Sequence, residues 1–380
     1  MSSILCFFHC ESNTGYAIQR HEYVFAHAAY KITQDWDKIH FAYPSLARGQ
    51  SDAIPTQVSN FAKLDFASTD TRHLQEIETY IRDNRITTAI GFDQPVHRKS
   101  YKYMRRGGVT KFMSYWGAPM SSLNTGIKLL LKRLQVSLIK DKPDLFVFQS
   151  QGMRKTAVYG RGIPFPQTYV VRSGINISKY IPDPQRQNQH VYELFDIPKD
   201  RKIIYYSGHM EARKGVAVIV RAAVELVARM GRQDVHFLFF GNQPGEEKAF
   251  DSIYKGTPAE SHITFGGYRS DLEKILPSCY AGVLATTGWD SYPMSTIEIG
   301  ASGLPLLVSD LLGVRETVLN GKTGLRFPVG DHVTLAEKLE YLLDNEPVRN
   351  KLGALARKRI ESKCSREQQV ARFVNALASI

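Results

Sequence analysis

Short, uniformly apolar segments recur along the first 172 residues, and longer stretches of mixed polarity separate them. Uniform apolarity is typical of strands that are buried on both faces of a parallel sheet. The long connections agree with this, because parallel strands need crossover segments between them. We therefore predict six strands here, within residues 4–8, 39–44, 87–92, 109–116, 144–150 and 168–174.

A second series of strands begins after residues 173–200, which are rich in Pro, Asn, Gln and Asp and show little periodicity. We interpret that segment as the join between two domains. Helices are predicted at 216–230 and 271–278, and the end of the chain is expected to be helical. Five strands are predicted within residues 202–208, 235–241, 263–268, 281–287 and 304–310. This alternation predicts an α/β protein with two domains in series.

The bulk composition fits an ordinary globular chain. It has 380 residues, of which 43% are hydrophobic and 23% charged, enough for two domains. No apolar run is long enough to predict a transmembrane helix, and we read residues 4–8 as a first strand, not as a signal peptide. The cysteines show no zinc-like spacing and are expected to be free thiols in a reducing cytosol: Cys6, Cys10, Cys279 and Cys364.

Basic residues follow the strand at 202–208. Arg213 and Lys214 precede Gly215 and the helix predicted from residue 216. A helix N-terminus offers free N–H groups and a partial positive charge, so this segment is a candidate anion site. A solvated turn with surface basic residues explains the sequence equally well.

Two acids flank the start of another predicted helix, at 294–301. Asp290 lies in the loop after a strand, Ser291 is expected to cap the helix, and Glu298 lies about one turn inside it. We expect the backbone of residues 290–294 to present N–H groups to a phosphate. We expect Glu298 to accept two hydrogen bonds from vicinal hydroxyls, such as those of a ribose. A surface glutamate is the alternative, but it accounts poorly for an acid within an apolar helix.

These motifs resemble the retaining GT-B glycosyltransferases of family 4, the glycosyl transferases group 1. The resemblance rests on Lys214 in "SGHMEARKG", on the Asp290 and Glu298 pair, and on the segments "DLFVFQSQGMRK", "VVRSGIN" and "GVRETVLNGKTGLRF". It covers almost the whole chain and is strongest in the C-terminal half. It implies a GT-B fold, in which two Rossmann-like α/β domains face a central cleft.

The resemblance also implies domain roles and an activity. Residues 1–172 would form the acceptor-side domain, residues 173–360 would bind the nucleotide sugar, and a terminal helix at 361–380 would cross back to the first domain. The reaction would be retaining sugar transfer from a nucleotide-diphosphate sugar, with UDP favoured over GDP. The acceptor would be a glycan or a lipid-linked glycan, in polysaccharide or glycolipid synthesis. No cofactor and no metal are expected.

The family's site residues map onto this sequence one by one. Lys214 would bind the donor diphosphate, Glu298 the ribose, and Asp290 would reach the donor sugar, which makes these three the expected catalytic residues. The expected substrate-binding residues are Gly15, Trp116, His209, Arg213, Ser291, Tyr292, Pro293 and Met294.

Several positions depart from the family's pattern. Asp290 stands where the family usually has Glu, and His209 stands where it usually has Arg. The N-terminal glycine-rich loop is reduced to "ESNTGYAIQ", and Trp116 replaces a common His, for which His9 and His97 are weaker candidates. Two alternatives therefore stay open: a catalytically degenerate GT-B protein that binds sugar nucleotide or glycan without turnover, and a soluble-glucan synthase.

Two motifs that imitate functional sites are read as turns. Asp35 and Asp37 imitate a metal-binding pair, but they precede a strand, so we expect a helix-to-strand turn. Residues 320–324 imitate the end of a phosphate loop and are also expected to form a turn. No His, Cys or Asp cluster predicts a metal site.

Positive charge is concentrated between Arg98 and Lys142. Eleven basic residues and one acid give this segment a charge of +10, out of +12 for the chain. Within it, a helix is expected between Ser121 and Lys140, with an apolar side (Ile127, Leu130, Leu131, Leu134, Leu138) and basic residues largely elsewhere (Lys128, Lys132, Arg133, Lys140). Such a helix can lie on an anionic membrane surface. It can equally pack on the core with a solvated basic edge. Interleaved aromatic residues also suit sugar stacking or RNA, although we expect no nucleic-acid partner.

Overall fold

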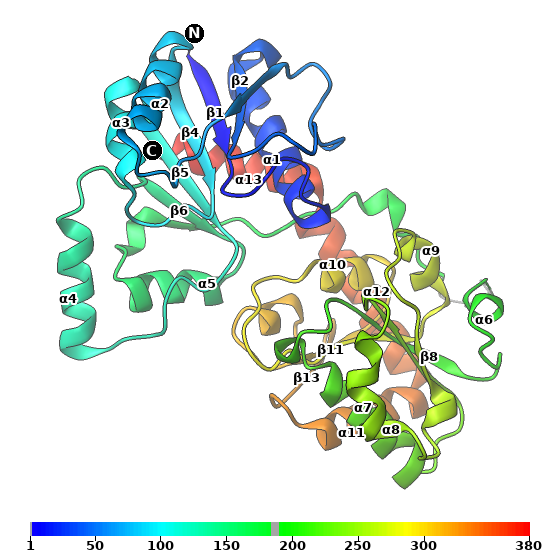
Figure 1. The fold of residues 1–380 in the computed structure, drawn as a ribbon. Coiled ribbons are helices and arrows are strands. Elements are labelled where there is room, and N and C mark those ends of the chain that lie inside the picture. The colour runs from blue at the N-terminus through cyan, green and yellow to red at the C-terminus, as the bar shows by residue number, and fades with distance from the viewer. Residues whose placement is uncertain (1, 184–189) are drawn as a thin grey trace. The chain divides into compact units, whose positions relative to one another are not determined.

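The computed structural model describes residues 2–183 and 190–380, so part of the expected join, residues 184–189, lies outside the described residues. The chain divides into two compact units (Figure 1). The first unit extends to Arg172 and also contains Arg366–Ile380, and the second unit is Ser173–Ser365. The terminal segment of the first unit begins at Arg366 and not at Glu361, because helix α12 (Glu346–Lys363) belongs to the second unit.

A parallel sheet of seven strands forms the centre of the first unit, in the order β3-β2-β1-β4-β5-β6-β7. Six of its strands coincide with predicted segments. The sequence missed β3, because its four residues lie at the sheet edge and none of them is buried. The strands are β1 (Ser3–Phe7), β2 (Ile39–Tyr43), β3 (Asn60–Lys63), β4 (Ile86–Phe92), β5 (Lys111–Trp116), β6 (Leu145–Phe148) and β7 (Thr168–Val170).

Helices cover both faces of this sheet. Alternate strand residues point to opposite sides, so one face packs on α1 and α13 and the other on α2 and α3. The chain's last helix is held by apolar contacts such as Phe25 with Phe373, whose ring centroids are 5.2 Å apart. The helices of this unit are α1 (Tyr16–Thr33), α2 (Thr71–Asp83), α3 (Lys99–Gly107), α4 (Gly126–Ser137), α5 (Gln151–Lys155) and α13 (Arg366–Ala378).

The second unit contains a parallel sheet of six strands, in the order β10-β9-β8-β11-β12-β13. Strand β13 was not predicted, because its sequence, Gly-Leu-Arg-Phe, is short and contains glycine and a charge. The strands are β8 (Lys202–Ser207), β9 (Val235–Phe240), β10 (Ile263–Phe265), β11 (Ala281–Leu284), β12 (Leu306–Ser309) and β13 (Gly324–Phe327).

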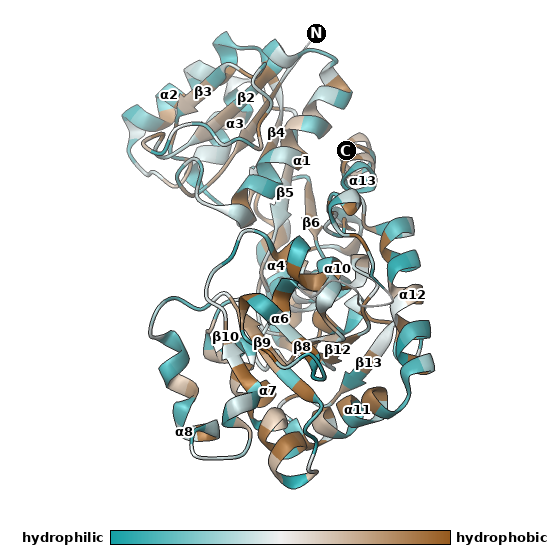
Figure 2. Ribbon diagram, turned by 90° about the vertical axis from the view of Figure 1, so that its right-hand side faces the viewer, coloured by the Kyte–Doolittle hydropathy of each residue, from teal (hydrophilic) through white to brown (hydrophobic). Residues whose placement is uncertain are grey.

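Helices also cover both faces of the second sheet. Helices α7 and α11 pack on one face, and α9, α10 and α12 pack on the other. Many helices carry both hydrophilic and hydrophobic colours in Figure 2, as expected when one side lies on a sheet. Besides α12, the helices of this unit are α6 (His190–Leu194), α7 (Val216–Val224), α8 (Asp251–Tyr254), α9 (Leu272–Ile275), α10 (Met294–Ala301) and α11 (His332–Asp344).

Each sheet reverses its direction of winding once. In the second unit the chain runs outward from β8 through β9 to β10, then returns to β11 on the other side of β8. In the first unit the same reversal lies between β1 and β4. Loops at the carboxyl ends of the two strands that flank such a point diverge and leave room for a ligand. These two places are therefore where a site is expected.

Candidate functional site

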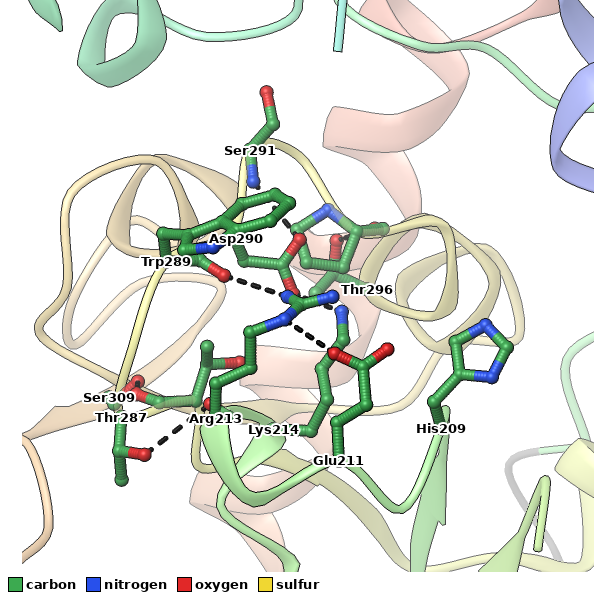
Figure 3. A network of polar contacts seen from close by, with 12 residues as sticks. His209, Glu211, Arg213, Lys214, Thr287, Trp289, Asp290, Ser291, Thr296 and Ser309 are labelled. Atoms are coloured by element: carbon green, nitrogen blue, oxygen red, sulfur yellow. Dashed lines mark hydrogen bonds and ion pairs between the residues drawn. The ribbon is translucent and has the colours of Figure 1, made fainter. Parts of the chain in front are cut away.

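The reversal point of the second sheet joins the two motifs that the sequence singled out. Lys214 follows β8 and Asp290 follows β11, and these two strands pair directly. The Lys214 Nζ lies 2.5 Å from the Asp290 Oδ2 (Figure 3). The side chains of Lys214 and Asp290 are only 16% and 11% exposed, so the contact is largely shielded from water. Residues 76 positions apart in the sequence thus form one ion pair.

Close backbone contacts hold the Lys214 loop in place. Gly215 has φ +72°, and a Cβ there would lie 1.8 Å from the Ala285 carbonyl oxygen, so only glycine fits. The carbonyl oxygen of Arg213 accepts hydrogen bonds from the N–H groups of Thr287 (2.8 Å) and Gly288 (3.2 Å). The loop after β8 is therefore fixed to the loop after β11.

Asp290 is held from two further directions. Its Oδ1 accepts a hydrogen bond from the Ser291 N–H at 3.0 Å, while its Oδ2 is paired with Lys214. Gly313, with φ +89°, lies against this segment, and a Cβ there would come within 2.2 Å of the Asp290 carbonyl oxygen. The Asp290 carboxylate thus binds both the Lys214 ammonium and the Ser291 N–H, two groups that were expected to face a phosphate.

Arg213 extends this network toward solvent. Its Nε donates to Glu211 Oε2 at 2.6 Å, a guanidinium N–H donates to the Trp289 carbonyl at 2.9 Å, and the guanidinium lies 4.1 Å from the centroid of the Trp289 ring. Figure 3 shows Glu211 and Trp289 on either side of it. The sequence reasoning missed both partners, because their roles depend on contacts between separate loops.

His209 lies beside this network without joining it. Its side chain is exposed, and Figure 3 draws no contact from its ring. Its carbonyl oxygen accepts a hydrogen bond from the Tyr206 hydroxyl at 2.9 Å. Burial, and then the negative charges of Asp290 and Glu211, raise the pKa of Tyr206. The phenol therefore stays a neutral donor.

The start of helix α10 differs from the expectation in two ways. The N-cap residue is Pro293, which supplies no side-chain cap, so the expectation that Ser291 caps the helix was wrong. The Ser291 hydroxyl is buried without a hydrogen-bond partner among the described residues. Pro293 also has no N–H, so residues 290–294 offer fewer donors than expected. The Ser291 N–H among them already donates to Asp290.

Glu298 is buried inside helix α10, which runs over Met294–Ala301 as predicted. It is 6% exposed, between the buried side chains of Ile297 and Ile299. The alternative of a surface glutamate is therefore wrong. A buried carboxylate needs polar partners, and the binding of a ligand by Glu298 stays a prediction.

Gly15 and Trp116 belong to the first unit and not to this network. Gly15 precedes α1 with φ +86°, and Trp116 ends β5. The sequence reasoning missed Asp93, which follows β4 at the reversal point of that sheet and accepts a hydrogen bond from the Gly117 N–H at 2.7 Å. Burial raises the pKa of Asp93. His9 follows β1 at the same point, and the place of an acid directly after a strand was the available signal.

A hollow of about 430 Å³ lies at the carboxyl ends of β9 and β10. Asn242 braces it, because its Oδ1 accepts from the Gly267 N–H (2.9 Å) and its amide donates to Glu247 (3.0 Å). Two aromatic side chains, Phe265 and Tyr268, belong to the lining. The hollow opens at the same edge of the sheet as Lys214 and Asp290.

The two imitating motifs behave as turns. Asp35 accepts a hydrogen bond from the Asp37 N–H and caps a 3-10 turn, and residues 321–323, within the expected segment 320–324, form the turn before β13. Across residues 2–183 and 190–380, no group of three or more His, Cys, Asp or Glu side chains could hold a metal ion. All four cysteines are free thiols, as predicted.

A family model described as glycosyl transferases group 1 matches residues 193–359, which contain Lys214, Asp290 and Glu298. This segment is similar to the glycosyl transferases group 1 family. A D-inositol 3-phosphate glycosyltransferase of Corynebacterium diphtheriae is 26% identical over 191 residues, 49% of this chain and 45% of the relative. The capsular polysaccharide biosynthesis glycosyltransferase CapM of Staphylococcus aureus is 25% identical over 51% of this chain and 49% of the relative. The chain thus spans about half the length of these curated relatives.

Solved structures of glycosyltransferases match over nearly the full chain. A glycosyltransferase from Rickettsia africae has a TM-score of 0.78 at 15% identity, over 99% of this chain and 98% of its own. Anabaena HepE, in complex with UDP and glucose, has a TM-score of 0.74 at 13% identity, over the whole of both chains. The predicted GT-B fold is confirmed, with two parallel-sheet α/β domains.

Proposed function

We propose that this chain is a retaining glycosyltransferase that moves a sugar from a nucleotide-diphosphate sugar to a glycan or lipid-linked acceptor. UDP is the favoured nucleotide and GDP the second. The observation that carries the proposal is the contact between Lys214 and Asp290 at the reversal point of the second sheet, with Glu298 buried in the helix that follows. The named activities of the relatives, and the UDP and glucose held by HepE, support it.

The diphosphate would bind where positive charge meets free backbone donors. Lys214 supplies a full charge, and helix α7 begins two residues later, at Val216, so the positive end of its dipole lies beside this loop. Arg213 adds a second charge, which Glu211 partly offsets. Lys214 is mostly shielded from water, so its attraction for a phosphate is stronger than that of a surface lysine.

This arrangement of positive charge would assist cleavage of the bond between the donor sugar and the diphosphate. Breaking the bond between the anomeric carbon and the phosphate oxygen leaves both electrons on the diphosphate and an oxocarbenium-like sugar. Preorganised cations and N–H groups stabilise the negative charge that develops on the leaving group. The acceptor oxygen would then attack from the same face, and its proton would pass to the leaving phosphate. No metal has a part in this scheme.

Asp290 would change partners when the donor binds. Its carboxylate occupies Lys214 and the Ser291 N–H, and these are groups that a diphosphate would use. We propose that the phosphate displaces the carboxylate, which then reaches the donor sugar. Glu298 would hold the ribose hydroxyls, and the hollow beside Phe265 and Tyr268 would take the nucleoside.

A panel of nucleotides and nucleotide sugars in a thermal-shift assay tests this proposal. We expect the melting temperature to rise with one nucleoside diphosphate class, equally with and without EDTA. A ligand present at a hundred times its Kd stabilises the native state by about 2.7 kcal/mol, which is readily detected. No shift with any nucleotide, or a shift abolished by EDTA, would contradict the proposal.

A catalytically degenerate protein that binds donor without turnover is the second candidate. The paired state of Asp290 and Lys214 favours it, because a site closed by its own carboxylate could bind weakly and never react. Slow donor hydrolysis that disappears in Lys214→Ala would exclude this candidate. Nucleotide binding without any hydrolysis or transfer would establish it. A soluble-glucan synthase would instead extend a water-soluble glucan from the same donor.

A further inference from the structure

Helix α4 (Gly126–Ser137) leaves its apolar side uncovered. Figure 1 shows it at the margin of the first unit, joined to the sheet by connecting segments. Its leucine side does not face the core, so the core-packing alternative is wrong. The exposed side chains are Ile127, Leu130, Leu131, Leu134 and Leu138, between 52% and 80% exposed. Scattered exposed apolar residues are common, but four on one short helix and a fifth at its C-cap form a continuous apolar surface.

The spacing of these residues puts them on one side of the helix. Successive residues turn by about 100°, so positions 127, 130, 131, 134 and 138 fall within roughly a third of the circumference. Val136 falls on the opposite side. It is fully buried and packs in a cluster with Phe146 of β6 and Ile163. The helix is therefore attached by its far side and turns its apolar side away from the protein.

Basic side chains flank this apolar surface. By the same geometry, Lys128 and Lys132 lie to one side of the apolar stripe and Arg133 to the other, and Lys140 follows the helix. None of these four forms an ion pair with another described residue. In contrast, Arg105 of the same basic segment is paired with Asp144. The positive charge beside the apolar stripe is thus available to a partner.

We propose that α4 lies flat on an anionic lipid surface, with its leucines among the acyl chains and its basic residues at the headgroups. A second protein of ordinary composition would not need cations on both sides of a leucine stripe. An anionic bilayer offers an apolar layer bordered by negative charge, which complements both features. No helix among the described residues is long and apolar enough to cross a membrane, so this attachment is peripheral.

This inference goes beyond the proposed donor chemistry, because α4 is in the other unit and shares no residue with the donor site. The proposal of membrane binding and the proposal of donor binding can be refuted independently. Loss of vesicle binding would leave the nucleotide panel unaffected, and the absence of a nucleotide shift would leave vesicle binding unaffected.

Sedimentation of the full chain with lipid vesicles tests the proposal. One set of vesicles is phosphatidylcholine alone, and the other contains about 40% phosphatidylglycerol. We expect binding to the anionic vesicles and at least tenfold weaker binding to the neutral ones, with a strong decrease between 0.1 M and 1 M salt.

Substitutions in α4 test whether this helix is responsible for vesicle binding. Leu130→Gln/Leu134→Gln keeps helix propensity and should weaken vesicle binding by at least about tenfold, because each buried leucine side chain contributes a large share of the partition energy. Leu355→Gln, at an exposed leucine of α12, is the matched control and should bind like wild type. Lys128→Gln/Arg133→Gln should lose the preference for anionic vesicles. All these positions are exposed, so the melting temperatures should be nearly unchanged.

Three results would overturn the proposal. The first is the absence of wild-type binding to anionic vesicles. The second is equal binding by wild type and Leu130→Gln/Leu134→Gln. The third is a dimer in light scattering that disappears in that double variant while no vesicles bind, which would assign the apolar side to a second copy of this chain.

Discussion

Replacing Asp290 by Asn should strengthen the binding of a free nucleoside diphosphate. The carboxylate competes with the diphosphate, because it holds the Lys214 ammonium at 2.5 Å and accepts the Ser291 N–H at 3.0 Å. Asn keeps the size of the side chain but carries no charge, and its single carbonyl oxygen can accept only one of these two bonds. The variant therefore removes the competing charge with little change in packing.

The size of the effect follows from these contacts. A hydrogen bond to a charged group contributes about 1.5–3 kcal/mol, and a neutral bond contributes about half of that. Displacing the neutral amide should then cost about 1.4 kcal/mol less than displacing the carboxylate, which corresponds to roughly tenfold tighter binding. Transfer should nevertheless slow, because the proposed contact of Asp290 with the donor sugar loses its charge.

Isothermal titration of UDP and GDP into both proteins measures this difference. Glu337→Gln is the control, since it changes the net charge equally at an exposed position on α11. Unchanged or weaker diphosphate binding by Asp290→Asn would refute the competition. An equal gain in diphosphate affinity in Glu337→Gln would show that the effect comes from the change in net charge and not from the contact with Lys214.

Three further predictions follow from the second unit. Lys214→Ala and Glu298→Ala should each lower kcat/KM for sugar transfer at least about a hundredfold while circular dichroism stays native, and wild-type rates in both would remove them from the site. Gly215→Ala should lower the melting temperature by several degrees and weaken diphosphate binding, because a Cβ would lie 1.8 Å from the Ala285 oxygen at a left-handed φ; a stable variant would contradict the geometry. Burial lowers the pKa of His236 to about 3, so its contribution to stability is complete above about pH 6.5 and falls by roughly 1.4 kcal/mol per unit as the pH drops toward 3. The melting temperature of His236→Gln should therefore decline less than that of wild type between pH 7 and pH 5, and parallel declines would show that His236 is not the group responsible.

Much of this architecture could be predicted from hydrophobic pattern alone. Strands such as β1, β2 and β9 are buried along their whole length, so their sequences are uniformly apolar and easy to recognise. Strands β3 and β13 lie at sheet edges and are partly exposed, so their sequences look like loops. Periodicity detects burial, and it therefore fails where a strand is only half covered.

The site could be predicted in its residues but not in its contacts. Glycine, lysine and acid positions after the strands pointed to two loops that the structure brings together, since the carboxyl ends of neighbouring parallel strands converge. The pairing of Lys214 with Asp290 depends on how two loops meet, as does the place of Glu211 beside Arg213. The same limit applies to α4, because one pattern of leucines is compatible with a buried or an exposed face. The exposure of the leucines and the burial of Val136 on the opposite side decide between them.

Release of the nucleoside diphosphate from a panel of nucleotide sugars is the most direct test of the central claim. The account predicts slow release from one donor class, unaffected by EDTA, faster with a glycan or lipid-linked acceptor, and abolished in Lys214→Ala. Release that persists in Lys214→Ala, or that requires a divalent metal, would contradict it.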